Sequence, residues 1–301
     1  MNGDTMFVQI HTKYKEKLQN VKLAWVDNTS CSINKCTIKT KNKTLVIKSK
    51  ELGLQTERYN RLAALEFQKG KPAKVLFFID KNVPEKVSKM HFECSLPNQA
   101  YRFMGLWSAI FSMKNETLKK FIISVMSDDT IIPLFYKARG SLSYHHSYVG
   151  GLFDHSYDVA VQSKLSALAN LLGDTSIDCA FVIGLLHDIG KIHMYYNKDL
   201  NGNLVGLNTQ HEALSFMILK EHFDILKAES PVLFEAVANS ITARTNRPMH
   251  NEYIVESIVR NADYISAEIN QNKMAFEGKP NSHYYADFNN QKRYKRLDYA
   301  N

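Results

Sequence analysis

Three short apolar runs in the first hundred residues have the length and composition of β-strands. They are rich in β-branched and aromatic residues, which favour strands. The runs are VKLAWVD (21–27), TLVIKS (44–49) and KVLFFID (74–80). Between the last two, residues 55–68 place Leu62, Ala63, Leu65 and Phe67 at positions that predict a helix. We therefore expect a mixed α/β N-terminal domain over residues 1–105.

After about residue 105 the apolar positions follow helical spacing. In residues 117–127 the apolar side chains Leu118, Phe121, Ile122 and Val125 form one stripe, and Pro133 limits the helix. Further helices are predicted at 152–172, 176–187, 231–243 and 253–270. The fold class is therefore predicted as α+β, with a mainly helical domain over residues 106–277. The polar, basic segment 278–301 is typical of a disordered tail.

Composition places the chain among globular proteins. Hydrophobic residues make up 45% and charged residues 23% of its 301 residues. It has neither the run of about 18 apolar residues that a membrane span needs nor an apolar signal segment near Met1. We expect a cytoplasmic protein without a membrane partner. The four cysteines include a close pair, Cys31 and Cys36, but no second pair completes a zinc site, which favours free thiols.

The net charge of +8 favours an anionic partner, either nucleic acid or a nucleotide phosphate. Six lysines and no acid lie between Asp27 and Glu51, and four cations surround Tyr294. The cations are Lys35, Lys39, Lys41, Lys43, Lys48 and Lys50 in the first cluster, and Lys292, Arg293, Lys295 and Arg296 in the second. A solvated surface or a frayed tail is the alternative interpretation of both clusters.

A set of histidine and aspartate residues lies on three predicted helices. His187 and Asp188 end an apolar helix in the string GLLHDIGK, His155 lies on the preceding helix, and Asp263 lies on a later one in RNADYISA. Imidazole and carboxylate groups together suit a divalent metal such as Mn, Fe, Ni or Zn, and three helices can direct them to one point. Taken singly, such a histidine is more often a hydrogen-bonded core residue, and Asp263 a cap or ion-pair residue. Burial of Asp188 behind an apolar helix requires a compensating charge, which favours the metal.

These residues resemble the H…HD…D signature of the HD-domain metal-dependent phosphohydrolase superfamily over about residues 140–270. The resemblance implies that His155, His187, Asp188 and Asp263 bind a divalent metal, which activates water for attack on a phosphoester. It also implies catalytic roles for Asp188 and for Lys191, whose ammonium group would neutralise the substrate phosphate.

A narrower similarity concerns HHSYVGGLFDHSYDVA (145–160). This segment is similar to the corresponding stretch of 3′-to-5′ exoribonucleases of the YhaM type and of MobH-class (TraI-like) relaxases. YhaM-type enzymes carry an N-terminal OB-fold, yet the first hundred residues show no clear five-strand pattern. The adjacent His-His pair that one dinuclear HD class has after His211 is replaced here by Thr242, Ala243 and Arg244.

Several further residues are candidates for the site. His145, His146 and His211 are candidates for a second metal or for substrate binding, although His145 and His146 could equally hold the loop before Gly150. Arg139 and Arg244 are candidates for phosphate contact, with a surface position as the alternative. The function predicted is a phosphodiesterase or nuclease that acts on single-stranded nucleic acid. The alternatives are a relaxase-like protein of a mobile element and a non-catalytic binding module.

Overall fold

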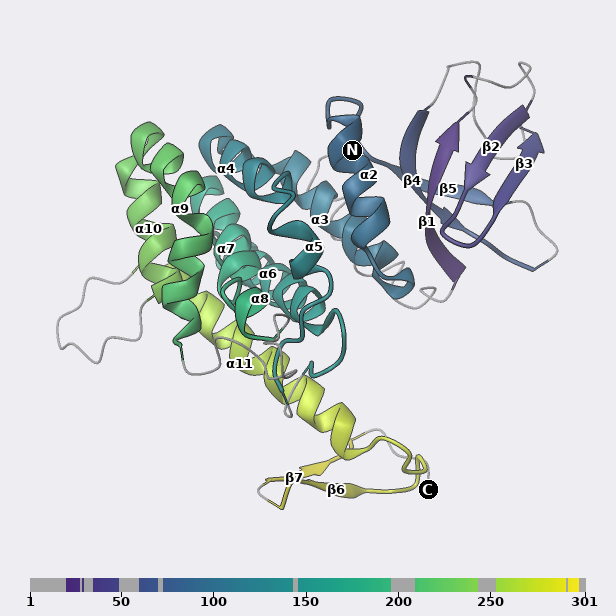
Figure 1. Ribbon diagram of the computed structural model, residues 1–301. Helices are drawn as coiled ribbons and strands as arrows, with labels where there is room; N and C mark the ends of the chain where they lie inside the picture. The colour runs from purple at the N-terminus through teal and green to yellow at the C-terminus, as the bar shows by residue number, and fades with distance from the viewer. Residues whose placement is uncertain are drawn as a thin grey trace, which may run out of the picture. The chain divides into compact units, whose positions relative to one another are not determined.

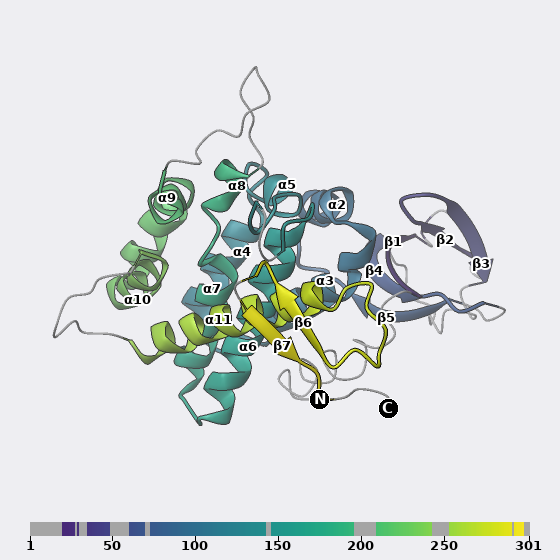
Figure 2. The ribbon, with the colours of Figure 1, turned by 90° about the horizontal axis from the view of Figure 1, so that it is seen from below.

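The computed structural model describes residues 20–27, 29, 35–48, 60–69, 73–142, 146–195, 209–242, 253–290 and 292–297. The chain forms two compact units, whose helices and strands are shown in Figures 1 and 2. Unit 1 comprises residues 1–137 and 221–229, and unit 2 comprises residues 138–220 and 230–301. The helical C-terminal region and the N-terminal antiparallel sheet confirm the predicted α+β class. Over the described residues, none of the helices has the length and hydropathy to cross a membrane.

Unit 1 begins with a five-stranded antiparallel sheet in the order β3-β2-β1-β4-β5. The strands are β1 (Val21–Asp27), β2 (Lys35–Lys39), β3 (Thr44–Lys48), β4 (Asn60–Glu66) and β5 (Lys74–Phe78). One face carries a core cluster of Ala24, Val26, Cys36, Ile38, Ala63 and Leu65. The register pairs Cys36 with Ile47 and Ile38 with Leu45, so the lysines of β2 and β3 face the other way.

The predicted helix over residues 55–68 is wrong, because residues 60–66 form strand β4. This strand is paired on both sides, with β1 and with β5, and the side chains of Leu62–Leu65 are all buried. A strand buried on both faces shows a continuous apolar run, which periodicity does not distinguish from a buried helix. Residues 55–59 lie outside the described residues. The three predicted strands are confirmed as β1, β3 and β5.

Helices complete unit 1. They are α2 (Glu85–Cys94), the 3₁₀ turn η3 (Pro97–Gln99), α3 (Ala100–Ser112), α4 (Glu116–Met126), α5 (Ile132–Phe135) and the second half of α9 (His211–Glu229). The α4 prediction is confirmed, and Asn115 caps this helix by accepting a 3.0 Å hydrogen bond from Leu118 N. Phe121 of α4 stacks on Phe223 of α9 with ring centroids 5.8 Å apart, which joins the two helices.

His91 of α2 is fully buried and bridges two helices. Its Nε2 lies 2.8 Å from the carbonyl oxygen of Met126, and its Nδ1 lies 2.8 Å from the hydroxyl of Tyr136. Because a carbonyl can only accept, Nε2 carries the proton and Nδ1 accepts from Tyr136. Burial lowers the pKa of His91 to about 4. The folded protein therefore stabilises the neutral form of the His91 imidazole.

We expect unit 1 to lose stability as the pH falls from about 6.5 to about 4. In this window the unfolded chain protonates His91 and the folded chain does not, so acid favours unfolding. The full loss is about 3 kcal/mol. Denaturant unfolding of wild type and His91→Gln, compared between pH 7 and pH 4.5, measures it. Gln keeps a donor and an acceptor but does not titrate, so its stability should fall less steeply. Equal pH dependence of the two proteins would contradict the assignment.

Unit 2 is a helical bundle. Its helices are α6 (Gly151–Ala169), α7 (Asp174–Leu186), α8 (Lys191–Met194), the first half of α9, α10 (Pro231–Thr242) and α11 (Ile254–Ala275). A Cβ on Gly184 of α7 would lie only 2.7 Å from Ala160 Cα of α6, so this glycine lets the two helices approach closely. The predicted helices at 152–172, 176–187, 231–243 and 253–270 are confirmed within a few residues, although α11 continues to Ala275.

The described C-terminal residues, 278–290 and 292–297, contain a two-stranded hairpin, a regular element that the composition of this segment did not predict. The hairpin consists of β6 (Tyr285–Phe288) and β7 (Lys292–Lys295) and follows the end of α11 in Figure 1. Ala286 and Phe288 alternate with exposed residues and pack with Ala275 and Phe276. This small apolar cluster stabilises the hairpin. Only Ala286 and Phe288 of its four buried side chains belong to the polar segment, so the average composition gives little sign of it.

Candidate metal centre

His155 comes from the first turns of α6 and is completely buried. Gly150 precedes the helix with φ 84°, a left-handed conformation that favours glycine and lets the chain turn tightly into the helix. A Cβ on Gly151 would lie 2.0 Å from the carbonyl oxygen of His146, so a side chain there would displace the loop. The two glycines therefore fix how α6 begins and where His155 lies.

His187 and Asp188 lie in the turn that follows α7. His187 Nδ1 lies 2.8 Å from the carbonyl oxygen of Gly184 and donates to it, which leaves Nε2 to face the site. Gly190 N donates to Ser215 Oγ at 2.9 Å, and a Cβ on Gly190 would lie 1.9 Å from His211 O. The first turns of α9 therefore pack directly on the turn that carries the two candidate ligands.

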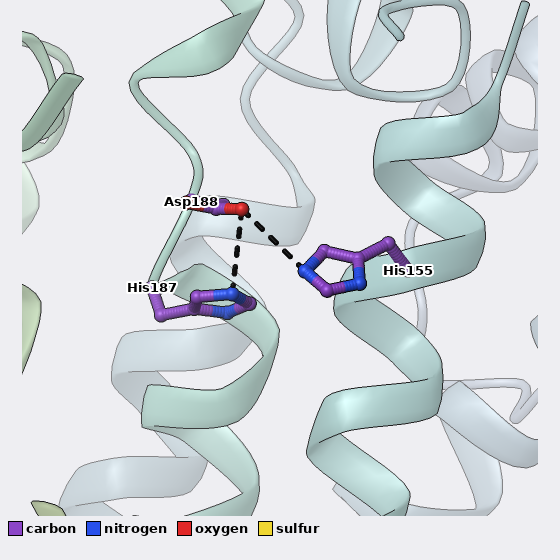
Figure 3. Close-up of side chains that lie close together, drawn as sticks. All are labelled: His155, His187 and Asp188. Carbon is purple, nitrogen blue, oxygen red and sulfur yellow. Dashed lines mark ion pairs between the residues drawn. The ribbon is translucent and has the colours of Figure 1, made fainter. Parts of the chain in front are cut away.

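Four side chains predicted from sequence converge at one point. Figure 3 shows His155, His187 and Asp188 directed toward one another. Asp188 Oδ2 lies 3.5 Å from His155 Nε2 and 3.4 Å from His187 Nε2. Asp263 Oδ1 of α11 lies 3.1 Å from His155 Nε2 and 3.7 Å from His187 Nε2. Nitrogen and oxygen atoms at these separations can bind one metal ion together.

The charges in this cluster favour a cation. Burial alone would lower the pKa of His187, but the carboxylates of Asp188 and Asp263 raise it to about 10. Burial would raise the pKa of Asp188, yet Lys191 and His187 hold it well below its usual range. His187 Nε2 is buried and makes no hydrogen bond among the described residues. A buried imidazole nitrogen beside two ionised carboxylates fits a divalent metal.

Lys191 and His211 contact the two oxygens of Asp188. Lys191 Nζ lies 2.6 Å from Oδ2, and His211 Nε2 lies 3.1 Å from Oδ1. The other ring nitrogen of His211 lies 3.3 Å from a carboxylate oxygen of Glu212. The structure thus places Lys191 and His211 beside the candidate ligands.

Of the four remaining predicted site residues, one lies near the candidate ligands, one is exposed at the surface, and two are outside the described residues. His146 is buried with φ 51°, and its ring lies 5.1 Å from the ring of His155. Its main-chain N–H donates to Asn270 Oδ1 at 3.1 Å, and its O accepts from Gly140 N at 2.9 Å, so it organises the loop before Gly150. Arg139 is exposed and does not line the pocket that opens beside the candidate metal ligands, which is described below. His145 and Arg244 lie outside the described residues.

A pocket opens beside the candidate metal centre, and several of its residues were not predicted. It is lined by His187, Asp188, His211, Glu212, Ser240, Ile241, Thr242, Glu256, Val259, Arg260 and Asp263. Arg260 and Glu256 lie one and two turns before Asp263 on α11. Helical spacing from Asp263 was the signal that could have found them, because residues three to four apart share a face.

Residues 152–268 match the HD domain family. The match supports the HD superfamily, whose members are metal-dependent hydrolases that bind divalent metals. It contains His155, His187, Asp188 and Asp263. No curated protein and no solved structure matches the chain. The narrower similarities to the exoribonucleases and the relaxases therefore stay predictions.

Proposed function

We propose that the protein is a metal-dependent phosphodiesterase that cleaves single-stranded nucleic acid. The proposal rests on the convergence of His155 from α6, of His187 and Asp188 from the turn after α7, and of Asp263 from α11. Imidazole nitrogens and carboxylate oxygens that lie close together are ligands suited to a divalent transition metal. The match to the HD domain family supports the hydrolase class.

The four residues would hold the metal, and each histidine is oriented by a second contact. His155 Nδ1 lies 3.1 Å from Ser266 Oγ, and His187 Nδ1 donates to Gly184 O. Such contacts fix the ring that presents Nε2 to a metal. When bound, a divalent metal supplies an acidified water as nucleophile and positive charge for the phosphate oxygens.

Two cations of this chain would bind the substrate phosphate. The Lys191 ammonium group lies within the cluster, and its position beside Asp188 suits a phosphate held at the metal. Arg260 is exposed at the pocket and offers a planar guanidinium group, which matches phosphate geometry. Their role is to orient the phosphoester and to offset the charge that develops on it.

The preference for nucleic acid is supported by a surface of unit 1, which we term the β2–β3 lysine face. It consists of the exposed side chains of Lys35 and Lys39 on β2 and of Thr44, Val46 and Lys48 on β3. Within the described part of the chain, none of the three lysines forms an ion pair. The sheet of unit 1 has five strands, and in OB-folds, which are also five-stranded, the face of strands 2 and 3 binds oligonucleotides.

A hydrolysis screen tests the proposal. Short single-stranded RNA and DNA, labelled at one end, are incubated with the protein and Mn²⁺, Fe²⁺, Ni²⁺ or Zn²⁺. We expect cleavage of at least one polymer that disappears when EDTA is added and is absent in Asp263→Asn. Hydrolysis of nucleotide monophosphates with no cleavage of either polymer would reject the polymer substrate.

We further expect binding to single strands to weaken steeply with salt, by about 0.7 in the log–log slope for each phosphate contacted. Replacement of Lys35, Lys39 and Lys48 with Gln should reduce that slope by about 2. Fluorescence anisotropy at several salt concentrations measures it. Lys86→Gln, Lys89→Gln and Lys119→Gln form the matched control, because these lysines belong to unit 1 but to its helices. A slope unchanged by the first set would place the phosphate contacts elsewhere, with the four cations around Tyr294 as the next candidates.

A further inference from the structure

Unit 1 contains an open pocket of about 360 Å³ that the metal centre does not use. It lies among the start of β1, the turn between β2 and β3, and the segment that joins α2 to η3. Lys22, Lys41 and Lys43 supply its cations, and Leu23, Phe67 and Leu96 contribute apolar surface. Within the described part of the chain, no acidic side chain lines it.

The turn between β2 and β3 holds two of the lysines in a defined place. Thr40 N donates to Lys43 O at 2.9 Å, and Lys43 N donates to Thr40 Oγ1 at 3.2 Å. This pair of bonds closes the turn, so Lys41 and Lys43 extend from a fixed backbone. Such preorganisation lowers the entropy lost when a ligand binds.

Lys41 carries a positive charge that no carboxylate of the described residues offsets. Its ammonium group donates to the carbonyl oxygens of Ser95 and Glu93. These contacts use two of its three protons, and among the described residues no acceptor takes the third, which can bind a ligand. Burial lowers the pKa of Lys41, as expected for an ammonium group in mostly apolar surroundings. An anion in the pocket would stabilise this charge.

We infer that this pocket binds a nucleoside phosphate, with the phosphate among Lys22, Lys41 and Lys43 and the flat base against Phe67 and the leucines. A volume of about 360 Å³ is in the range of small-molecule pockets. Three ammonium groups suit a phosphate, and the apolar surface suits a ring. The ligand is either a free nucleotide or the phosphorylated end of a strand, since both present the same chemistry.

NMR titration of the full chain, with the methyl groups of Leu23 and Leu96 as reporters, tests the inference. EDTA is present throughout, and the ligands are AMP, adenosine and inorganic phosphate. We expect AMP to shift both methyl resonances in a saturable way and to bind more tightly than adenosine or phosphate alone. Tighter binding of a 5′-phosphorylated trinucleotide than of AMP assigns the strand end, and the reverse assigns the free nucleotide.

Lys22→Ala and Lys43→Ala should each weaken AMP binding roughly three- to tenfold. Lys86→Ala, which removes an exposed lysine of α2, is the control and should have no effect. Asp188→Ala should also leave the binding unchanged, which separates this inference from the proposed hydrolase activity. The inference is overturned if millimolar AMP moves neither methyl resonance, if adenosine binds as tightly as AMP, or if Lys22→Ala/Lys43→Ala binds AMP normally.

Discussion

Asp188→Ala should lose the bound metal and nearly all hydrolytic activity. Asp188 Oδ2 is within 3.5 Å of both candidate histidine ligands, so its removal opens the centre of the cluster. Loss of a supporting contact typically weakens metal binding 10- to 100-fold, and loss of a direct ligand should exceed about 100-fold. Metal titration and turnover of the same preparation measure the two effects.

The Asp188→Ala substitution also removes the ion-pair partner of Lys191 and so could destabilise the fold. A second variant controls for this effect. Asp188→Asn keeps the shape and one oxygen but removes the charge, and should still bind metal far less tightly than wild type. His283→Ala is the control, because His283 is an exposed histidine of unit 2 outside the cluster. Full metal occupancy in Asp188→Ala would show that the ligand assignment is wrong.

Lys191→Ala should keep the metal and lose about 10²-fold in kcat, the magnitude seen when one preorganised electrostatic group is removed. The ammonium group is 2.6 Å from Asp188 Oδ2, and its side chain is only 14% exposed. Burial would lower the pKa of Lys191, but Asp188 raises it, so the group stays protonated. A protonated ammonium group cannot ligate the metal but can donate to a phosphate bound beside it.

The comparison of Lys191→Ala with Lys191→Arg separates charge from structure. Arg keeps the charge and should retain more activity than Ala, whereas metal content should be the same in both. Lys279→Ala removes an exposed lysine of unit 2 and should behave as wild type. Wild-type turnover of Lys191→Ala on every phosphoester tested would show that Lys191 has no electrostatic role in hydrolysis.

The candidate metal ligands were predictable because sequence and chemistry constrain them strongly. Asp188 directly follows the apolar end of α7, so its buried negative charge requires a positive charge nearby. His155 and Asp263 lie on helices with clear apolar periodicity. The metal-binding role that sequence assigned to these residues stays a prediction until metal is measured. What the structure adds is that the four side chains lie within 4 Å of one another in the pairs described above.

The strand β4 and the pocket of unit 1 were not predictable in the same way. Leu62–Leu65 is buried on both faces, so its pattern lacks the alternation that marks a strand. The pocket of unit 1 combines Lys22, Lys41 and Leu96, which are far apart in sequence and meet only through the strand pairing and the α2–η3 junction. The local sequence pattern carries no information about which distant residues will line the same pocket.

The most direct test of the account is the metal content of the purified protein, measured by mass spectrometry together with phosphodiester turnover before and after chelation. We expect a tightly bound divalent transition metal, loss of turnover when it is removed, and recovery when Mn²⁺, Fe²⁺, Ni²⁺ or Zn²⁺ is restored. Turnover that persists at the wild-type rate after complete removal of metal would contradict the account.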